Sequence, residues 1–328
     1  MLHFVEKFDF WFSKVSHKLN AENLEQFCAD TLKNYKLKLL PFIFIFLLAV
    51  SCRDKVQDTF PDFENKLVLN SILIKDSVLN VHLSLTRPID NSDFPTVNNA
   101  TVKLYIDGVF AEDLTSVGNG LYSSTTIVES EKEYHCEAFV VGYDKVYATT
   151  VIPKTTTLTD ITHIENSGKN DEGQTYPALR FAFSNTQETQ YYQVLIKLFY
   201  YENISYATLE KITDPIILNE GLPIAVFSND GIVGNTYTMQ LNYTTNTSSS
   251  EGMNLYPLIV EFRSISKEYY HFVKQLYLYE QNRYPDNMLS GGKPFQLYSN
   301  ITNGYGIFAG YSAFTSDTIF PFNAQLQY

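Results

Sequence analysis

Cysteine is rare in this chain of 328 residues, which contains only Cys28, Cys52 and Cys136. Basic residues are also in the minority: 24 Lys and Arg stand against 36 Asp and Glu, for a formal net charge of −12. Nucleic-acid phosphates and anionic lipid headgroups are bound mainly through Lys and Arg. The composition therefore disfavours nucleic-acid binding and an electrostatic hold on a membrane.

Long apolar runs are missing as well. The apolar stretch over residues 39–50 is interrupted at Pro41, and it is shorter than the roughly 20 residues that a membrane-spanning helix needs. Lysines precede it, and the small residues Ala49 and Ser51 lead to Cys52. Basic, apolar and small residues in this order are typical of an export signal. We therefore expect residues 1–51 to be a leader with a lipoprotein signal peptide, and Cys52 to be lipidated.

The leader is unusually long, because about 36 residues precede its apolar stretch. No methionine follows Met1 until Met239. Either translation begins at a non-ATG codon near residues 32–39, which we favour, or the basic region is extended. Cleavage would leave residues 52–328 with 18 basic and 31 acidic residues, since the leader holds six of the 24 and five of the 36.

Cysteine usage excludes an intramolecular disulfide in the mature chain, because Cys28 leaves with the leader and the Cys52 sulfur carries the lipid. Cys136 shares a strand face with Ala138 and Val140 at period two. We therefore predict that Cys136 is a buried small hydrophobic residue.

The strand pattern begins after a polar, lipidated tether at 52–65. Residues 79–86 alternate strictly between apolar and polar side chains, which is typical of a half-buried strand. Short strands separated by turn signals indicate a β-sandwich of immunoglobulin, fibronectin or transthyretin type over 66–153. The predicted strands are 66–74, 79–86, 100–107, 109–116, 120–128, 132–142 and 145–152.

Residues 154–328 predict a second β-rich domain with one amphipathic helix near 266–281. Ser266 can cap this helix, and Tyr269, Phe272, Val273 and Leu276 share one face. Residues 164–175 and 244–253 are predicted to be loops, and the chain after Arg283 to be extended and loop-like, with 298–314 closing this domain's core. The predicted strands are 176–184, 191–201, 211–218, 236–243 and 256–263.

Candidate sites are few. The mature histidines are far apart in sequence, and the glycine-rich run 304–310 has Ala309 where a dinucleotide loop needs glycine. We therefore predict no catalytic residue, metal site or cofactor. Tyrosines crowd one predicted strand, and tyrosine suits interfaces because a polar tip ends its flat apolar ring. The candidate interface residues are Tyr191, Tyr192, Tyr200 and Tyr201.

Two short motifs match an acceptor pattern for O-glycans, Asp-Ser/Thr-aliphatic. They are Asp76-Ser77-Val78 and Asp317-Thr318-Ile319. We expect Ser77 and Thr318 to be candidate O-glycosylation sites.

Several segments together resemble a known family. Residues 97–102, 118–122, 142–143 and 148–153 resemble its first half, residues 264–272 its helix and residues 298–308 its C-terminal signature. The family consists of Bacteroidetes lipoproteins and is called domain of unknown function 4249. Its genes often lie beside those of TonB-dependent receptors. The resemblance implies an accessory role at the outer membrane, with such a receptor as partner.

We therefore expect a lipid-anchored outer-membrane protein that is a non-enzymatic binding or accessory module, on either the surface or the periplasmic face. A hydrolase acting on glycan or peptide is the first alternative, and carboxylates about 5–9 Å apart on facing strands would favour a glycosidase. A structural or adhesive surface protein is the second.

Overall fold

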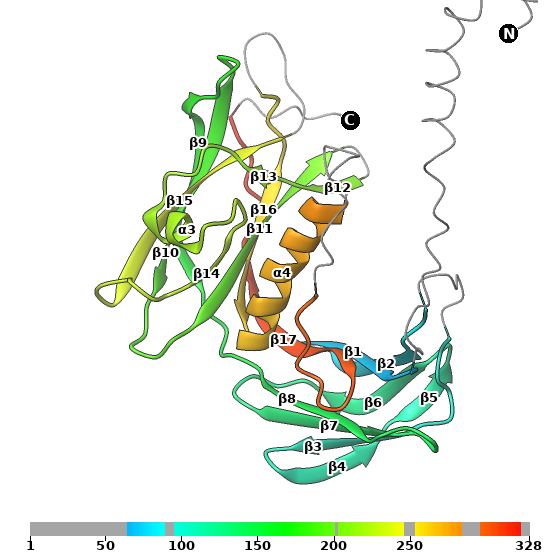
Figure 1. Ribbon diagram of the computed structural model, residues 1–328. Helices are drawn as coiled ribbons and strands as arrows, with labels where there is room; N and C mark the ends of the chain where they lie inside the picture. The colour runs from blue at the N-terminus through cyan, green and yellow to red at the C-terminus, as the bar shows by residue number, and fades with distance from the viewer. Residues whose placement is uncertain (1–63, 89–94, 201–202, 246–252, 284–295, 323–328) are drawn as a thin grey trace, which may run out of the picture. The chain divides into compact units, whose positions relative to one another are not determined.

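The computed structural model describes residues 64–88, 95–200, 203–245, 253–283 and 296–322 (Figure 1). Residues from Phe63 to Tyr328 form one compact unit. Strands dominate it, which confirms the predicted all-β class. Within these ranges, no helix is both long and apolar enough to cross a membrane. Cys52 and Tyr201 lie outside the described residues.

Most strands up to Val151 follow the predicted period-two pattern, whereas β4 and β5 are largely exposed on both faces. In β7, for example, Tyr134, Cys136 and Ala138 are buried and the residues between them are not, because successive side chains point to opposite faces of a sheet. The strands are β1 (Leu67–Ile74), β2 (Val78–Leu85), β3 (Thr101–Ile106), β4 (Val109–Asp113), β5 (Thr115–Gly118), β6 (Leu121–Ile127), β7 (Glu133–Phe139) and β8 (Val146–Val151).

The elements after Pro153 are mostly strands as well. They are β9 (Leu158–Lys169), β10 (Thr175–Ser184), β11 (Tyr191–Tyr200), β12 (Asn203–Tyr206), β13 (Thr208–Leu209), α3 (Pro215–Glu220), β14 (Val226–Ser228), β15 (Thr236–Thr244), β16 (Leu258–Ile265), α4 (Lys267–Arg283) and β17 (Tyr305–Thr315).

Three predictions for this second part were wrong. The strand predicted at 211–218 is instead helix α3, because Asp214 caps it by accepting from the Ile216 and Ile217 amides, and Pro215 begins it. The loop predicted from residue 164 is strand as far as Lys169, since β9 pairs with β10 there. The tail predicted to be loop-like contains β17, an eleven-residue strand.

Helix α4 is confirmed close to its predicted bounds. Ser266 caps it: its hydroxyl accepts from the Tyr269 amide at 3.3 Å and from the Gly310 amide of β17 at 3.3 Å. The Tyr270 amide donates to the Ser266 carbonyl at 3.0 Å. One residue thus starts the helix and fixes it to the sheet.

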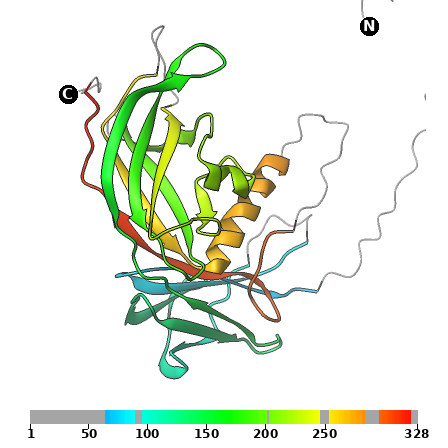
Figure 2. The ribbon, with the colours of Figure 1, turned by 90° about the vertical axis from the view of Figure 1, so that its left-hand side faces the viewer.

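Strand β17 joins the two parts of the chain through one sheet. It pairs in parallel with β1 and antiparallel with β16, so a nine-stranded sheet runs in the order β12-β11-β16-β17-β1-β2-β6-β5, with β14 beside β11. Figures 1 and 2 show β17 in red alongside β1 in blue. The boundary predicted at 153/154 is therefore bridged by backbone hydrogen bonds.

Two further four-stranded sheets cover this large sheet. The sheet β4-β3-β7-β8 encloses a first core with β1, β2 and β6, and the sheet β13-β15-β10-β9 encloses a second core with β11 and β16. A third cluster lies between α4 and the strands β14, β16 and β17.

The segment 298–314 meets the core that we predicted only at its end, where Phe314 packs against the second core. Phe308 is fully buried in the first core, whereas Ile307, Ala309 and Tyr311 pack in the cluster beneath α4. Alternate residues of a strand point to opposite faces. The segment therefore completes the N-terminal sandwich on one face and seats the helix on the other.

Candidate binding surface

The outer face of the sheet β4-β3-β7-β8 carries a row of four aromatic side chains. Register places Tyr105 of β3 opposite both Phe110 of β4 and His135 of β7. Ring centroids are 5.7 Å apart for Phe110–Tyr105, 5.6 Å for Tyr105–His135 and 5.8 Å for His135–Tyr147. We call Phe110, Tyr105, His135 and Tyr147 the ring row.

The ring row faces outward because its neighbours face the core. Leu104, Cys136 and Ala148 alternate with its members along β3, β7 and β8 and are almost completely buried. Phe110 at the β4 edge is 49% exposed. Two adjacent pairs meet edge to face, at 74° for Phe110–Tyr105 and 63° for Tyr105–His135, a favoured aromatic geometry, and His135–Tyr147 is tilted at 45°. The rings therefore support one another, and the three besides Phe110 are half-buried.

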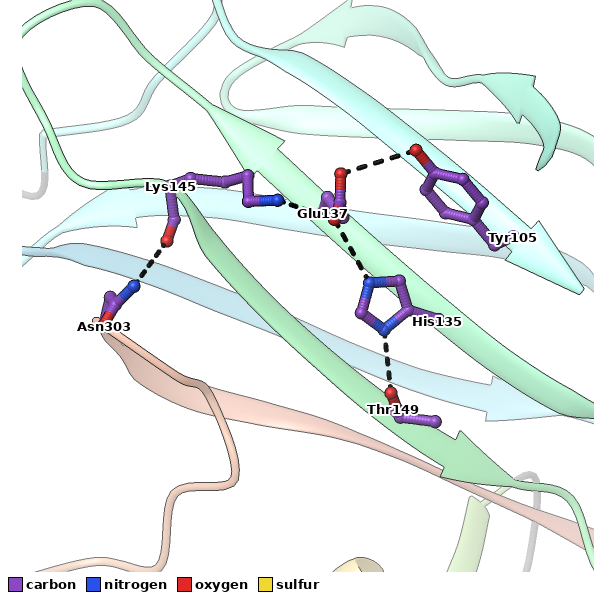
Figure 3. A network of polar contacts seen from close by, with 6 residues as sticks. All are labelled: Tyr105, His135, Glu137, Lys145, Thr149 and Asn303. Carbon is purple, nitrogen blue, oxygen red and sulfur yellow. Dashed lines mark hydrogen bonds and ion pairs between the residues drawn. The ribbon is translucent and has the colours of Figure 1, made fainter. Parts of the chain in front are cut away.

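A polar network lies beside the ring row (Figure 3). The Glu137 carboxylate accepts from Lys145 Nζ at 2.8 Å and lies 3.4 Å from His135 Nε2. Its other oxygen accepts from the Tyr105 hydroxyl at 3.5 Å. His135 Nδ1 lies 2.8 Å from the Thr149 hydroxyl. Both ring nitrogens of His135 thus have partners, which fixes its orientation in the row.

Charge in this network is balanced. The hydrogen bond from Lys145 is the main reason that the pKa of Glu137 is lowered, and Glu137 in turn raises the pKa of Lys145. Lys145 Nζ also lies 5.6 Å from the centre of the Tyr147 ring, and Lys103 Nζ lies 5.2 Å from that of Phe110. Cations placed against rings in this way can make cation–π contacts. The surface therefore combines apolar area with paired charges, as protein interfaces do.

The structure places the tyrosines that were predicted to form an interface in different environments. Tyr192 is 1% exposed and packs against Phe183, Phe227 and Phe262, so its ring is not on the surface. The prediction of Tyr192 as an interface residue is therefore corrected, because β11 turns this side chain toward the second core.

Tyr191 and Tyr200, which were also predicted at the interface, pack against neighbouring side chains. Tyr191 is half-buried and stacks on Tyr270 of α4 at 4.7 Å, and Tyr200 meets Tyr256 at 5.0 Å. Tyr201 falls outside the described residues. The tyrosines of β11 thus mainly pack the interior and the helix.

Of the remaining candidate residues, the two predicted glycosylation sites are exposed and the cysteine is buried. Ser77, in the turn between β1 and β2, and Thr318, after β17, are both exposed. Cys136 is buried, as predicted, and burial raises the pKa of its thiol to about 12. Among the described residues, no three His, Cys, Asp or Glu side chains gather as a metal ion would require.

The buried carboxylates of Asp214 and Glu261 and the half-buried Glu220 have partners. Asp214 caps α3 and accepts from the Tyr237 hydroxyl at 3.1 Å. Glu220 pairs with Lys274 at 2.7 Å. Glu261 pairs with Lys197 and, at 2.5 Å, with Arg263. Each acid is thus held in place by hydrogen bonds or ion pairs.

Sequence reasoning missed the ring row. His135 lies at the polar phase of its predicted strand, but Tyr105, Phe110 and Tyr147 are spread over three other strands. The available signal was an aromatic residue at the outward phase of each strand. Only strand register, which turns and pairing decide, shows that these residues meet.

The chain was compared with family models, with curated proteins and with solved structures. The family model described as Domain of unknown function (DUF4249) matches residues 53–317. No curated protein matches the chain. A crystal structure titled "Putative membrane anchored protein from Corynebacterium diphtheriae" is 8% identical, with 61% of this chain and 54% of that chain covered.

The chain thus spans about half the length of that protein, and a TM-score of 0.19 means that the likeness supports no argument about fold or function. The family match is of a different kind, because it extends from the residue after Cys52 to the residues after β17. It includes every element described above. The chain belongs to the family described as Domain of unknown function (DUF4249).

Proposed function

We propose that this protein is a lipid-anchored, non-enzymatic binding module whose ring row docks a protein partner in the outer membrane. The observation that carries this proposal is the ring row itself, four neighbouring aromatic side chains on the outer face of one sheet. Tyr and other aromatic residues are enriched at the centres of protein interfaces. Genes of this family often lie beside those of TonB-dependent receptors, so such a receptor is the partner to test.

The anchor in this proposal is a diacylglyceryl group on Cys52. Its support is the order of basic, apolar and small residues before Cys52. Acyl chains hold a protein at the membrane without any cationic surface, which agrees with the net charge of −12. Outer-membrane location and an accessory role follow from the family resemblance.

A binding role fits the chemistry of the surface better than catalysis does. Glu137 is charge-paired and the pKa of its carboxyl is lowered, whereas a general acid needs a raised pKa. The nearby His135 has partners on both nitrogens. A hydrolase or an adhesive protein would be recognised by other outcomes of the test below.

The test is co-purification of the lipidated protein with a TonB-dependent receptor produced in the same cells. Phe110→Ala and Tyr105→Ala remove ring area from the surface without opening the core. Leu218→Ala is the matched control, because Leu218 of α3 is 56% exposed and lies outside the ring row. Intact mass of each variant reports the diacylglyceryl group.

We expect both ring variants to lose the receptor while melting like the unaltered protein, and the control to retain it. Equal receptor recovery by all variants would remove the ring row from the interface. Glycan or peptide cleavage that depends on Glu137 would instead favour the hydrolase.

A further inference from the structure

The turn between β7 and β8 presents two large apolar side chains to solvent. Val141 is 84% exposed at its tip, and Phe139 at the end of β7 is 50% exposed. The turn is well formed: the Tyr143 amide donates to the Val140 carbonyl at 3.1 Å, and Gly142 supplies the left-handed position with φ 91°. Tyr143 packs partly against the first core. The apolar tip is therefore held in place by its own base.

The chain that leads from Cys52 enters the fold beside this same turn. A surface pocket is lined by both segments, and its residues are Glu64, Asn65, Lys66, Leu67, Gly142, Tyr143, Asp144 and Asn303. Asn303 also donates to the Lys145 carbonyl at 3.1 Å. From Cys52 to Glu64, the chain can reach at most about 40 Å when fully extended. A lipid on Cys52 would thus keep this end of the sandwich near the bilayer.

We propose that the β7–β8 turn inserts into the membrane interface, with Val141 and Phe139 among the lipid headgroups. This inference rests on the proposed lipid anchor. Aromatic side chains favour the headgroup region because they are apolar with polarisable faces, and burial of apolar area from water is favourable. The partner is a zwitterionic lipid surface, since Glu64 and Asp144 stand beside the turn and Lys145 is paired with Glu137.

The insertion has a consequence for the proposed docking. Phe139 lies on the same outward phase of β7 as His135 and Glu137. A turn resting on the bilayer would therefore bring the ring row close to the membrane plane. A receptor embedded in that membrane would be within reach of it.

The test uses tryptophan as a depth reporter. The sequence has one tryptophan, Trp11, which leader cleavage removes. Val141→Trp therefore places a single reporter in the mature protein, and Val233→Trp is its control, since Val233 is 93% exposed on the loop before β15. Each lipidated protein is reconstituted into vesicles of phosphatidylcholine, with or without bromine on the acyl chains, because bromine quenches nearby tryptophan.

We expect Val141→Trp emission to shift to the blue on vesicles and to lose intensity when the lipid is brominated, and Val233→Trp to show neither change. Lipidated, vesicle-bound Val141→Trp that behaves like the control would overturn the insertion alone. Protein whose intact mass lacks the diacylglyceryl group would overturn the anchor and the insertion together.

Discussion

At the scale of single residues, burial decides what Cys136 can do. Its thiol lies in the first core, and desolvation raises its pKa to about 12, with a smaller contribution from the Glu137 charge. This is above the ordinary value of 9.0, so the neutral thiol favours the fold below about pH 9, and that contribution is lost as the pH rises through about 12. The thiolate is the reactive form of cysteine. Cys136 is therefore inert in the folded protein.

We predict that the processed, folded protein resists a thiol-reactive dye at mildly alkaline pH, and that denaturant exposes one reactive thiol. The physical reason is that both solvent access and deprotonation are blocked at Cys136. Absorbance of the released dye measures the reaction. Cys136→Ala gives the background, and rapid labelling of the native protein above that background would contradict the prediction.

Phe308 supports a second prediction at this scale. Its side chain is completely buried in the first core, so Phe308→Ala should lower the free energy of unfolding by about 3–5 kcal/mol. Phe320→Ala is the control: Phe320 is 64% exposed, and its change should stay within about 0.5 kcal/mol. Denaturant titration measures both. A Phe308→Ala protein as stable as the parent that has lost its partner would instead place Phe308 at an interface.

At the scale of elements, β17 has an edge that no strand of the described residues covers along its first half. Its pairing with β16 begins at Tyr311. Before that point, the Asn300 side chain takes the place of a strand: its amide nitrogen donates to the Phe308 carbonyl at 2.7 Å, and its oxygen accepts from the Phe308 amide at 2.9 Å. One side chain thus satisfies both backbone groups of a core residue.

We predict that Asn300→Ala lowers the free energy of unfolding by about 1–3 kcal/mol, because it leaves a backbone donor and acceptor without partners. Asn80→Ala is the control, since Asn80 is exposed on β2 and its amide reaches only the nearby Val78 carbonyl at 3.3 Å. Hydrogen exchange of the Phe308 amide adds a local readout. Slow exchange in Asn300→Ala, equal to that of the parent, would show that the side chain is dispensable.

The elements also show what can be predicted from sequence. Strands such as β2 and β7 were predictable because one of their faces is buried, so alternation is visible in the residues. Helix α3 was not, because the apolar pair Ile216 and Ile217 looks like strand and the deciding contact is the cap at Asp214. Strand β17 was not predicted because it contains glycines, which are uncommon inside strands. Glycine is needed at position 306, since a side chain there would collide with the Leu69 carbonyl. The ring row needed strand register, which no single segment contains.

At the scale of the whole molecule, two cores share one sheet. The sheet passes from β11 and β16 through β17 to β1 and β2. The first core also receives Ile301 and Phe308 from the far end of the chain. The N-terminal sandwich therefore lacks a complete core made from its own continuous segment, whereas the residues of the second core all come after Pro153.

We predict that residues 64–153 produced alone fail to form a cooperatively folded sandwich. They would lack Phe308 and the strand that pairs with β1, so the exposed edge and the open core should favour a loosely packed state. Near-ultraviolet circular dichroism and thermal melting measure this. A fragment with the sharp melting transition of the full protein would show that the sandwich is independent of β17.

The pairing of β1 with β17 also determines when the fold can form. The Ile307 amide donates to the Asn70 side chain across 237 positions of sequence. Contacts between residues so distant form slowly, because a long loop must close before they stabilise anything. During synthesis, β1 must therefore wait until β17 has been made before the two strands can pair. Until β17 has been synthesised, β1 lacks its parallel partner and the first core lacks Phe308, so the sandwich built from the earliest strands stays open while the second core is being made.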